Sequence, residues 1–502
     1  MHTHPFTHLH KFKLLLVLLL PRSSIILRCT FYIQPDNMKL QLLASWMLLV
    51  ALLILQTNSN ARSTNTTQVI IPSDESQQIS NQLQTNTFTL SAEEDHARIM
   101  RLLGIKELRR WRDGLDPTSP YYPNYDESKA NPYPNLPDPL KLKSGELVTT
   151  ASMWWDFRRP ELIEDFEREI YGRLPANIPP VKWTVANTTN ILIAGKPVEI
   201  QTLTGSVTNA NRRVNIQALV GIPLAITSPV PLIIQIGFLP RRGIPTPPIW
   251  QQLLVSNGWG FAVLDAYSVQ RDSGTYLTEG IIGLCNNGQP RPLEQWGALR
   301  AWAWGASRLL DYLETEKRID ATHVGIEGHS RFGKAALIAM TFDQRFAIVY
   351  ASSSGAGGAK LLRRNWGETV ENLASTGEYH WMAGNFLKYA GPLTWADLPV
   401  DAHELIALCA PQPVFITAGR DDADGWVDAR GMFMAAVAAT PVYKLLGAEG
   451  IETTNMPPLD TPLIKGRIGF CQHSGGHDDR PTWPIFIQFA QQFFTKPKPH
   501  TN

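Results

Sequence analysis

A single serine stands where an apolar β-type segment meets a helix-type segment. Residues 323–326 form a short run with β-branched side chains, and residues 335–340 have the composition of a helix. Gly328 and Gly333 flank Ser330, and glycine is needed where a tight, strained turn leaves no space for a Cβ atom. The following helix would direct backbone N–H groups and its positive dipole end at the serine, an arrangement that suits an oxyanion. The pattern predicts a nucleophile elbow, with an ordinary polar-capped turn as the alternative.

Partners for such a serine follow in the order Ser, acid, His. An apolar strand-type segment, residues 413–418, ends at a glycine and is followed at once by an acidic loop that holds Asp422 and Asp424. His477 lies further on, just before the last helix-type segment. This order and context are those of a serine hydrolase built on a parallel sheet. Ser330 is therefore the predicted nucleophile, and both aspartates remain candidates for the acid.

Of the two histidines in the late loop, His477 is the predicted base. It follows a pair of glycines at the tip of the loop, whereas His473 is expected to be a core or supporting residue. Asp421 is interpreted as a solvated loop charge. In the triad mechanism His477 takes the serine proton, a carboxylate fixes the imidazole tautomer, and the reaction passes through an ester intermediate.

Two basic residues follow the serine directly. Arg331 is placed to direct a guanidinium at a developing oxyanion, and the alternative is a surface ion pair. Lys334 lies one helical turn after Ser330, so it can face the same cleft and bind substrate hydroxyls. Taken without context, a helical lysine is usually only solvated.

Charge and cysteine content exclude several classes of function. A net charge of +1 with 18% charged residues gives no reason to expect a nucleic acid or a membrane surface as partner. The spacing of the four cysteines fits no zinc pattern and allows at most one disulfide in a mature chain that lacks Cys29. No metal and no cofactor are predicted. The cysteines are Cys29, Cys285, Cys409 and Cys471.

The N-terminal region predicts export. Met38 is followed by a basic residue, the apolar segment 42–55, and a small-residue end at Ala61. This describes a signal peptide cleaved near Ala61, and the apolar segment is too short for a comfortable membrane span. An N-terminal membrane anchor is the alternative. We expect residues 1–61 to comprise an over-extended start and the signal peptide, and the mature protein to be secreted or periplasmic without stable membrane association.

The remaining chain predicts one large domain, residues 93–496, after a disordered leader at residues 62–92. Seven prolines within residues 117–139 indicate an extended segment on the surface. Short β-type runs then alternate with helices, which predicts a doubly wound α/β sheet. Predicted helices span 93–111, 159–171, 296–313 and 483–494, and predicted strands span 198–203, 214–220, 231–236, 261–264, 346–351 and 413–418.

The sequence from Gly328 to Lys334, with serine, arginine, glycine and lysine at fixed spacing, resembles the signature of the glucuronoyl esterases, carbohydrate esterase family 15. Supporting stretches lie at residues 158–173, 363–372 and 426–431, and the likeness extends over about residues 95–495. The resemblance implies an α/β-hydrolase fold, a three-layer sandwich with a mostly parallel central sheet, and catalysis without a metal. It also implies cleavage of esters that join 4-O-methyl-glucuronic acid side chains of xylan to lignin alcohols.

The resemblance also implies roles for individual residues. Ser330 would be the nucleophile, His477 the base and Arg331 the oxyanion stabiliser. Lys334, Glu368 and Trp381 would contact the hydroxyls of the uronate ring.

The chain departs from the family pattern at two positions. Many members carry the catalytic acid as a glutamate on the loop after the strand that follows the serine helix, but that position is Ala356 here. The acid is therefore expected from the Asp422/Asp424 loop, as in a minority of members. His329 stands where fungal members have a disulfide-forming cysteine, which favours a bacterial-type member.

Two other functions remain open from the sequence. The chain could be another carbohydrate esterase, such as an acetyl-xylan esterase, or a non-catalytic carbohydrate-binding relative. For an active esterase the expected partner is a polysaccharide ester, and for a glucuronoyl esterase it is a glucuronoxylan–lignin ester. The protein is expected to act as a monomer.

Overall fold

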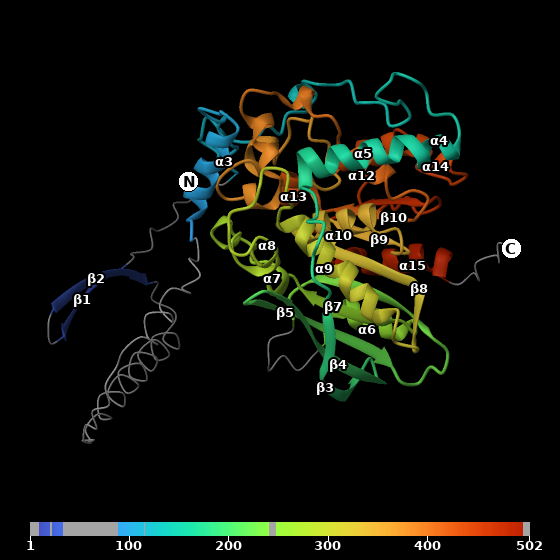
Figure 1. Cartoon of the computed structure of the whole chain (residues 1–502), viewed down its shortest axis with the longest axis horizontal. Coiled ribbons are helices and arrows are strands. Elements are labelled where there is room, and N and C mark those ends of the chain that lie inside the picture. The colour runs from blue at the N-terminus through green and yellow to red at the C-terminus, as the bar shows by residue number, and fades with distance from the viewer. Residues whose placement is uncertain (1–9, 21–22, 34–88, 115, 240–246, 495–502) are drawn as a thin grey trace, which may run out of the picture. The chain divides into compact units, whose positions relative to one another are not determined.

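The computed structural model describes residues 10–20, 23–33, 89–114, 116–239 and 247–494 (Figure 1). The chain divides into two units, residues 1–85 and 86–502. In the first unit, β1 (His10–Leu20) and β2 (Ser23–Ile33) form an antiparallel pair. The predicted signal peptide and the predicted leader up to residue 88 lie outside the described residues.

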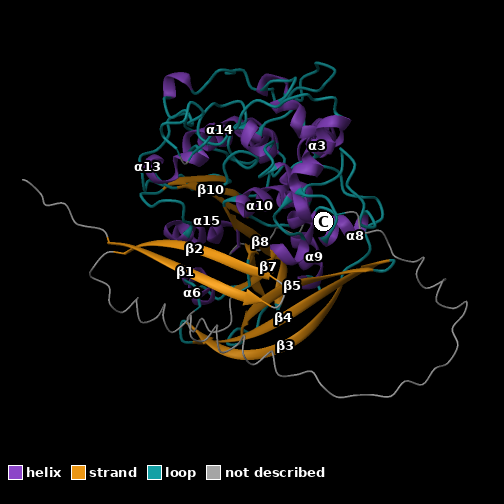
Figure 2. Cartoon of the chain, turned by 90° about the vertical axis from the view of Figure 1, so that its left-hand side faces the viewer, coloured by secondary structure: helices purple, strands orange, loops and turns teal. Residues whose placement is uncertain are grey.

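The second unit is built on a nine-stranded sheet with the order β11-β10-β9-β8-β6-β7-β5-β4-β3. The pairs from β11 to β7 are parallel, and the pairs β7–β5, β5–β4 and β4–β3 are antiparallel. Figure 2 shows β3 and β10 toward opposite ends of the twisted sheet. The strands are β3 (Lys182–Ile193), β4 (Lys196–Asn209), β5 (Arg212–Pro223), β6 (Val230–Gly237), β7 (Gly260–Asp265), β8 (Ile319–His329), β9 (Val349–Ser352), β10 (Val414–Ala418) and β11 (Ile468–Gln472).

Helices cover both faces of the parallel part. The major helices are α3 (Ala92–Leu102), α5 (Arg159–Asp165), α6 (Ile249–Ser256), α9 (Ala298–Leu313), α10 (Arg331–Phe342), α12 (Ala402–Ala407), α14 (Ala429–Leu445) and α15 (Trp483–Phe494). Shorter helices are α4 (Ala151–Met153), α7 (Ala266–Val269), α8 (Gly280–Cys285), α11 (Val370–Leu373) and α13 (Asp421–Asp424). Single turns of 3₁₀ or π type join several of them.

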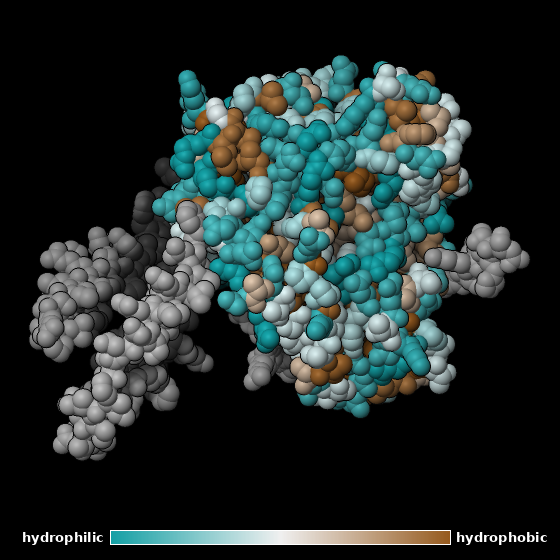
Figure 3. All heavy atoms as spheres, viewed as in Figure 1, coloured by the Kyte–Doolittle hydropathy of each residue, from teal (hydrophilic) through white to brown (hydrophobic). Residues whose placement is uncertain are grey.

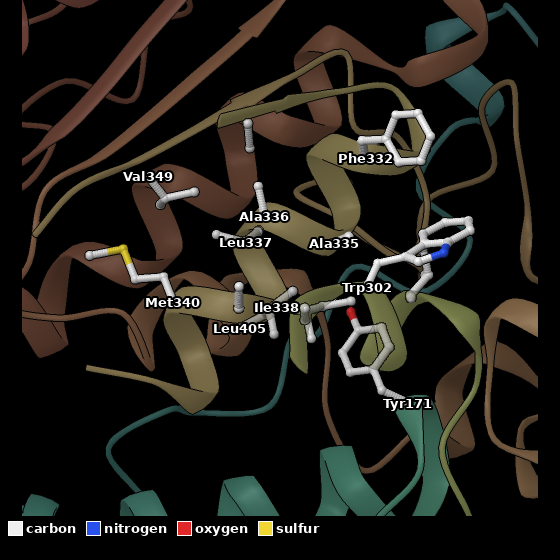
Figure 4. Packing of buried hydrophobic residues seen from close by; sticks show 14 of the residues in the cluster. Tyr171, Trp302, Phe332, Ala335, Ala336, Leu337, Ile338, Met340, Val349 and Leu405 are labelled. Carbon is white, nitrogen blue, oxygen red and sulfur yellow. The ribbon is translucent and has the colours of Figure 1, made fainter. Parts of the chain in front are cut away.

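Alternate residues of the central strands belong to two separate apolar cores. Leu232 and Ile234 of β6 lie in the larger core with α9 and α10, whereas Ile233 lies in the smaller core with α6 and α15. Side chains alternate between the faces of a strand, so a strand covered on both faces must be apolar throughout. This explains the continuous apolar runs and confirms the α/β-hydrolase sandwich. Figure 4 shows part of the larger core, where Trp302 of α9 packs against Phe332 of α10, with ring centroids 5.3 Å apart.

Most predicted elements occur, and their bounds differ for local reasons. The first helix ends at Leu102 rather than at residue 111, because Gly104 adopts a left-handed φ of 67° that ends a helix. The helix predicted over 159–171 ends before Gly172 (φ 88°) as predicted, but it is π-helical from Phe166. The strand predicted over 346–351 is shifted to Val349–Ser352. The sequence reading missed β3, β11, α6, α12 and α14.

The surface of the second unit is mainly hydrophilic on the face shown in Figure 3, with separate apolar patches. Among the described helices, none combines the length and the apolar character needed to cross a bilayer. The described cysteines, Cys285, Cys409 and Cys471, are free thiols. Within the described ranges, no cluster of three or more His, Cys, Asp or Glu side chains is arranged to hold a metal ion.

Candidate active site

Four neighbouring parallel strands deliver the candidate catalytic side chains to one edge of the sheet. Ser330 follows β8, Ser353 follows β9, Asp424 ends the short helix α13 after β10, and His477 lies on the loop after β11. In parallel α/β sheets, ligands bind in the crevice outside these carboxyl ends. The strand order therefore explains how residues almost 150 positions apart in the sequence come together.

Ser330 occupies a strained turn between β8 and α10. Its backbone has φ 58° and ψ −129°, a conformation that a residue with a Cβ rarely adopts and that persists mainly at functional sites. Gly328 and Gly333 are required here, because a Cβ on Gly328 would lie 2.1 Å from the carbonyl oxygen of Phe332 and a Cβ on Gly333 would lie 2.8 Å from that of Ser352. The Ser330 N–H donates to the same Ser352 carbonyl at 2.8 Å, which fixes the turn.

His477 is bonded to Asp424. The distance from His477 Nδ1 to Asp424 Oδ1 is 2.6 Å. The second oxygen of Asp424 accepts from the Gly419 N–H at 2.8 Å and from Ser353 Oγ at 2.7 Å, and the carboxylate side chain is 1% exposed. Three donors thus hold the carboxylate in one orientation. An Nδ1–H that donates to Asp424 leaves the His477 Nε2 lone pair able to take a proton.

Asp422, the other candidate acid, is placed differently. Its side chain is 73% exposed and pairs with Arg420 at 2.9 Å on the same loop. His473 is buried, and its Nδ1 accepts from the Gly475 N–H. The structure brings Asp424 and His477 together, and it does not bring Asp422 or His473 into that pair.

His329 packs against the candidate base, with ring centroids 4.4 Å apart. Its Nδ1 lies 3.1 Å from Ser352 Oγ. Burial lowers the pKa of His329, and the neighbouring His477 lowers it further. The ring beside the base therefore stays neutral when His477 becomes an imidazolium, which avoids two adjacent positive charges.

Lys334 and Glu368 form a buried ion pair. Lys334 Nζ lies 2.9 Å from Glu368 Oε2 and donates to the Ala356 carbonyl at 2.6 Å, while the Ala356 N–H donates to Glu368 at 2.9 Å. Both charged side chains are 4% exposed. Ala356 is fully buried, and its peptide groups hold this pair.

Arg331 and Trp381 meet at a residue that the sequence reading missed. Asp272, which lies beyond β7, accepts from Arg331 Nη1 at 2.5 Å and from the Trp381 indole N–H at 2.6 Å. The indole N–H is therefore already bonded, and the ring instead lies 5.6 Å from both the Arg331 guanidinium and Lys334 Nζ. An aspartate shortly after the carboxyl end of a parallel strand was the signal that could have identified Asp272.

Glu378 is a second residue that the sequence reading missed. One of its carboxyl oxygens, Oε2, is buried and has no hydrogen-bond partner among the described residues. Burial and the charge of Glu368 raise its pKa to about 8, although Lys334 and Arg331 oppose that rise and Asp272 adds to it. A protonated carboxyl group thus lies among the charged residues of the site at neutral pH.

This raised pKa predicts a pH-dependent stability. Between pH 4.5, the ordinary value for glutamate, and about pH 8 the folded chain retains a proton that the unfolded chain has lost. The free energy of unfolding should therefore fall as the pH rises through this window, and Glu378→Gln, which cannot ionise, should show a smaller fall. Melting temperatures at pH 5 and pH 8 measure this, with the exposed Glu452→Gln as control. An equal fall in wild type and Glu378→Gln would contradict the assignment.

A cavity of about 650 Å³ opens beside His477 and Asp424. Much of its wall is aromatic, and part comes from the proline-rich segment predicted to lie on the surface. Such rings are flat apolar faces onto which a sugar or an aromatic ring can stack. The lining residues are Tyr122, Tyr125, Trp366, Asp421, Asp422, Ala423, Asp424, Gly425, Trp426 and His477.

Comparison with known proteins shows the family of this chain. The profile of a family described as glucuronyl esterase, fungi, matches residues 206–447. A protein named carbohydrate esterase MZ0003, from an unknown prokaryotic organism, is 32% identical over 411 residues, which cover 74% of this chain and 92% of the relative. The solved structure of a CE15 glucuronoyl esterase from Teredinibacter turnerae is 43% identical, with a TM-score of 0.76 over 80% of this chain and 99% of the other. The chain belongs to carbohydrate esterase family 15.

Family 15 membership confirms the resemblance stated from the sequence. As a member of the glucuronoyl esterases, the chain is a carboxylic ester hydrolase. A Hypocrea jecorina protein named 4-O-methyl-glucuronoyl methylesterase is 28% identical over 320 residues, 62% of each chain. A structure described as a promiscuous CE15 esterase from a marine bacterial metagenome is 31% identical, with a TM-score of 0.66 over 74% of this chain and all of the other.

Proposed function

We propose that this chain is a secreted serine esterase that hydrolyses 4-O-methyl-glucuronoyl esters between glucuronoxylan and lignin alcohols. The observation that carries the proposal is the His477–Asp424 hydrogen bond at the sheet edge that holds Ser330 on its strained turn. The names of the relatives support a uronic acid as the acyl group. The apolar segment 42–55 after Met38 supports export.

In this proposal Ser330 Oγ attacks the ester carbonyl while His477 Nε2 takes its proton. Asp424 holds the Nδ1–H tautomer and stabilises the imidazolium that forms. The tetrahedral intermediate collapses when the C–O bond to the alcohol breaks and the proton passes from His477 to the leaving oxygen. The uronoyl group then remains on Ser330 as an ester. A water molecule, deprotonated by His477, attacks this ester. The bond between the acyl carbon and Ser330 Oγ then breaks, His477 returns the proton to Oγ, and the uronic acid leaves.

The oxyanion forms next to two sources of positive potential. The backbone N–H groups at the start of α10 point toward the serine, and the Arg331 guanidinium extends from the first residue of that helix. Removal of a single oxyanion-hole donor costs about 10²–10³ in kcat in a serine protease.

The charged groups near Ser330 suit a sugar acyl group better than an acetyl group. In a glucuronoyl ester the sugar ring is on the acyl side, so the acyl pocket must bind several hydroxyls. Lys334, Glu368 and Glu378 supply polar groups there, and Arg331 and Trp381 border them. Because Lys334 and Glu368 are already paired, we propose that they act as a preformed unit and that this unit and Glu378 bind the hydroxyls.

The test is substrate preference. We expect kcat/KM for a benzyl or methyl glucuronate ester to exceed that for an acetylated xylose by at least about 100-fold, because buried polar groups left unpaired by a small acyl group disfavour it. Initial rates on the two substrates, measured by alcohol and acetate release, give this ratio. Faster acetyl release would favour an acetyl esterase, and hydrolysis of neither ester by the folded chain would favour the non-catalytic alternative.

A further inference from the structure

Asp272 is the centre of a hydrogen-bond network and has no role in the catalytic steps proposed above. Its Oδ1 accepts from His380 Nε2 at 2.8 Å and from Trp381 Nε1 at 2.6 Å. Its Oδ2 accepts from the Tyr267 hydroxyl at 3.0 Å and from Arg331 Nη1 at 2.5 Å. The carboxylate is 6% exposed. Four donors from four residues converge on one buried side chain.

The protonation states in this network follow from the contacts. Burial raises the pKa of Asp272, but the hydrogen bonds from His380 and Trp381 outweigh it and hold that pKa well below its ordinary value. Burial lowers the pKa of His380, and its Nδ1 is buried without a hydrogen-bond partner among the described residues. A neutral imidazole with its proton on Nε2 satisfies both facts, since a buried Nδ1–H without an acceptor would be costly. The charged pair is therefore Asp272 with Arg331.

The ion pair with Asp272 holds the Arg331 guanidinium through Nη1, while the arginine side chain stays 42% exposed to solvent. Trp381, itself held by Asp272, lies 5.6 Å from the guanidinium carbon. A long side chain that is anchored in this way does not need to reorient when negative charge develops, and preorganised donors are the effective ones in catalysis.

We infer that Asp272 is a positioning residue, which holds the Arg331 guanidinium at the oxyanion side of Ser330 by the Nη1 ion pair and by fixing Trp381. This inference rests on the proposed function, in which Arg331 stabilises the oxyanion. The competing interpretation is that Asp272 only stabilises the fold by binding four buried donors.

The first test compares kcat with KM for a glucuronate ester. Asp272→Asn has one acceptor oxygen and places an NH₂ group against a donor, so it loosens Arg331. We expect kcat to fall about 10- to 100-fold, a fraction of the loss of an oxyanion donor, with KM changed less than about threefold. Asp311→Asn, which removes one acidic partner of Arg345 on the surface, is the charge-matched control and should match wild type.

The second test asks whether Asp272 holds a guanidinium that is not part of the chain. Arg331→Ala should lose activity, and added guanidinium ion should restore part of it because Asp272 and Trp381 still form the cradle. Methylammonium should restore much less, since it lacks the planar shape that matches a carboxylate. The double variant Arg331→Ala/Asp272→Asn should show no guanidinium rescue and no further loss beyond Arg331→Ala.

The outcomes separate the interpretations. Rescue of equal size in the single and double variants, or wild-type kcat in Asp272→Asn, would overturn the positioning role while leaving the esterase proposal intact. A wild-type chain inactive on the glucuronate ester would instead overturn the proposed function. Melting curves accompany each variant. If Asp272→Asn does not fold, the guanidinium-over-methylammonium preference of Arg331→Ala decides the question, because that chain retains Asp272, and equal rescue by the two cations overturns the role.

Discussion

Ser330→Ala is expected to lower kcat for a glucuronate ester by about 10⁵- to 10⁶-fold, the size of effect that removal of a nucleophile has in other serine hydrolases. Without Oγ no acyl-enzyme can form, and only binding and oxyanion stabilisation remain. The substitution should not disturb the fold, because alanine has the same backbone cost as serine at φ 58°. Burst and steady-state alcohol release, with melting temperature measured in parallel, test this expectation.

Ser228→Ala provides the matched control for that experiment. Ser228 lies exposed between β5 and β6, away from the carboxyl edge of the parallel strands, so its loss should leave kcat unchanged. If Ser330→Ala keeps a substantial fraction of wild-type kcat at an unchanged melting temperature, the nucleophile is another residue and the elbow has only a structural role.

Asp424→Asn should have the second largest effect, about 10⁴-fold in kcat. The Gly419 N–H and Ser353 Oγ donate to one oxygen of Asp424, so the asparagine oxygen will take that position and its NH₂ will face His477 Nδ1. Nδ1 must then accept, which places the proton on Nε2 and leaves no lone pair for the Ser330 proton. A pH–rate profile and the imidazole ¹⁵N chemical shifts of His477 report this tautomer directly.

Asp422→Asn is the control on the same loop. Its carboxylate is exposed and paired with Arg420, and exposed ion pairs contribute about 0–1 kcal/mol. We expect wild-type activity within about twofold. A large loss in Asp422→Asn together with a small loss in Asp424→Asn would reverse the assignment of the acid and would require the loop to rearrange when substrate binds.

The fold could be predicted from periodicity because the central strands are buried on both faces. Continuous apolar runs such as 231–236 and 261–264 identify such strands, and helices at 296–313 and 483–494 show apolar residues at helical spacing. The bounds were less predictable where a single backbone conformation decides them, as at Gly104, although the helix end before Gly172 was predicted correctly. The strand β3 was missed because most of its residues are exposed and lack an apolar alternation.

The sequence alone determined the elbow around Ser330, the order of serine, acid and histidine, and the family signature through Lys334, since each depends on residues close together in the chain. Only the tertiary structure separated Asp424 from Asp422, because two carboxylates on one loop differ in burial and direction rather than in spacing. The same holds for Asp272 and Glu378, which meet Arg331 and Lys334 across long stretches of chain. Asp272 matters through its low exposure and its hydrogen bonds to other elements, and Glu378 matters through the burial of its carboxyl group among charged residues. Neither property can be inferred from a local sequence pattern.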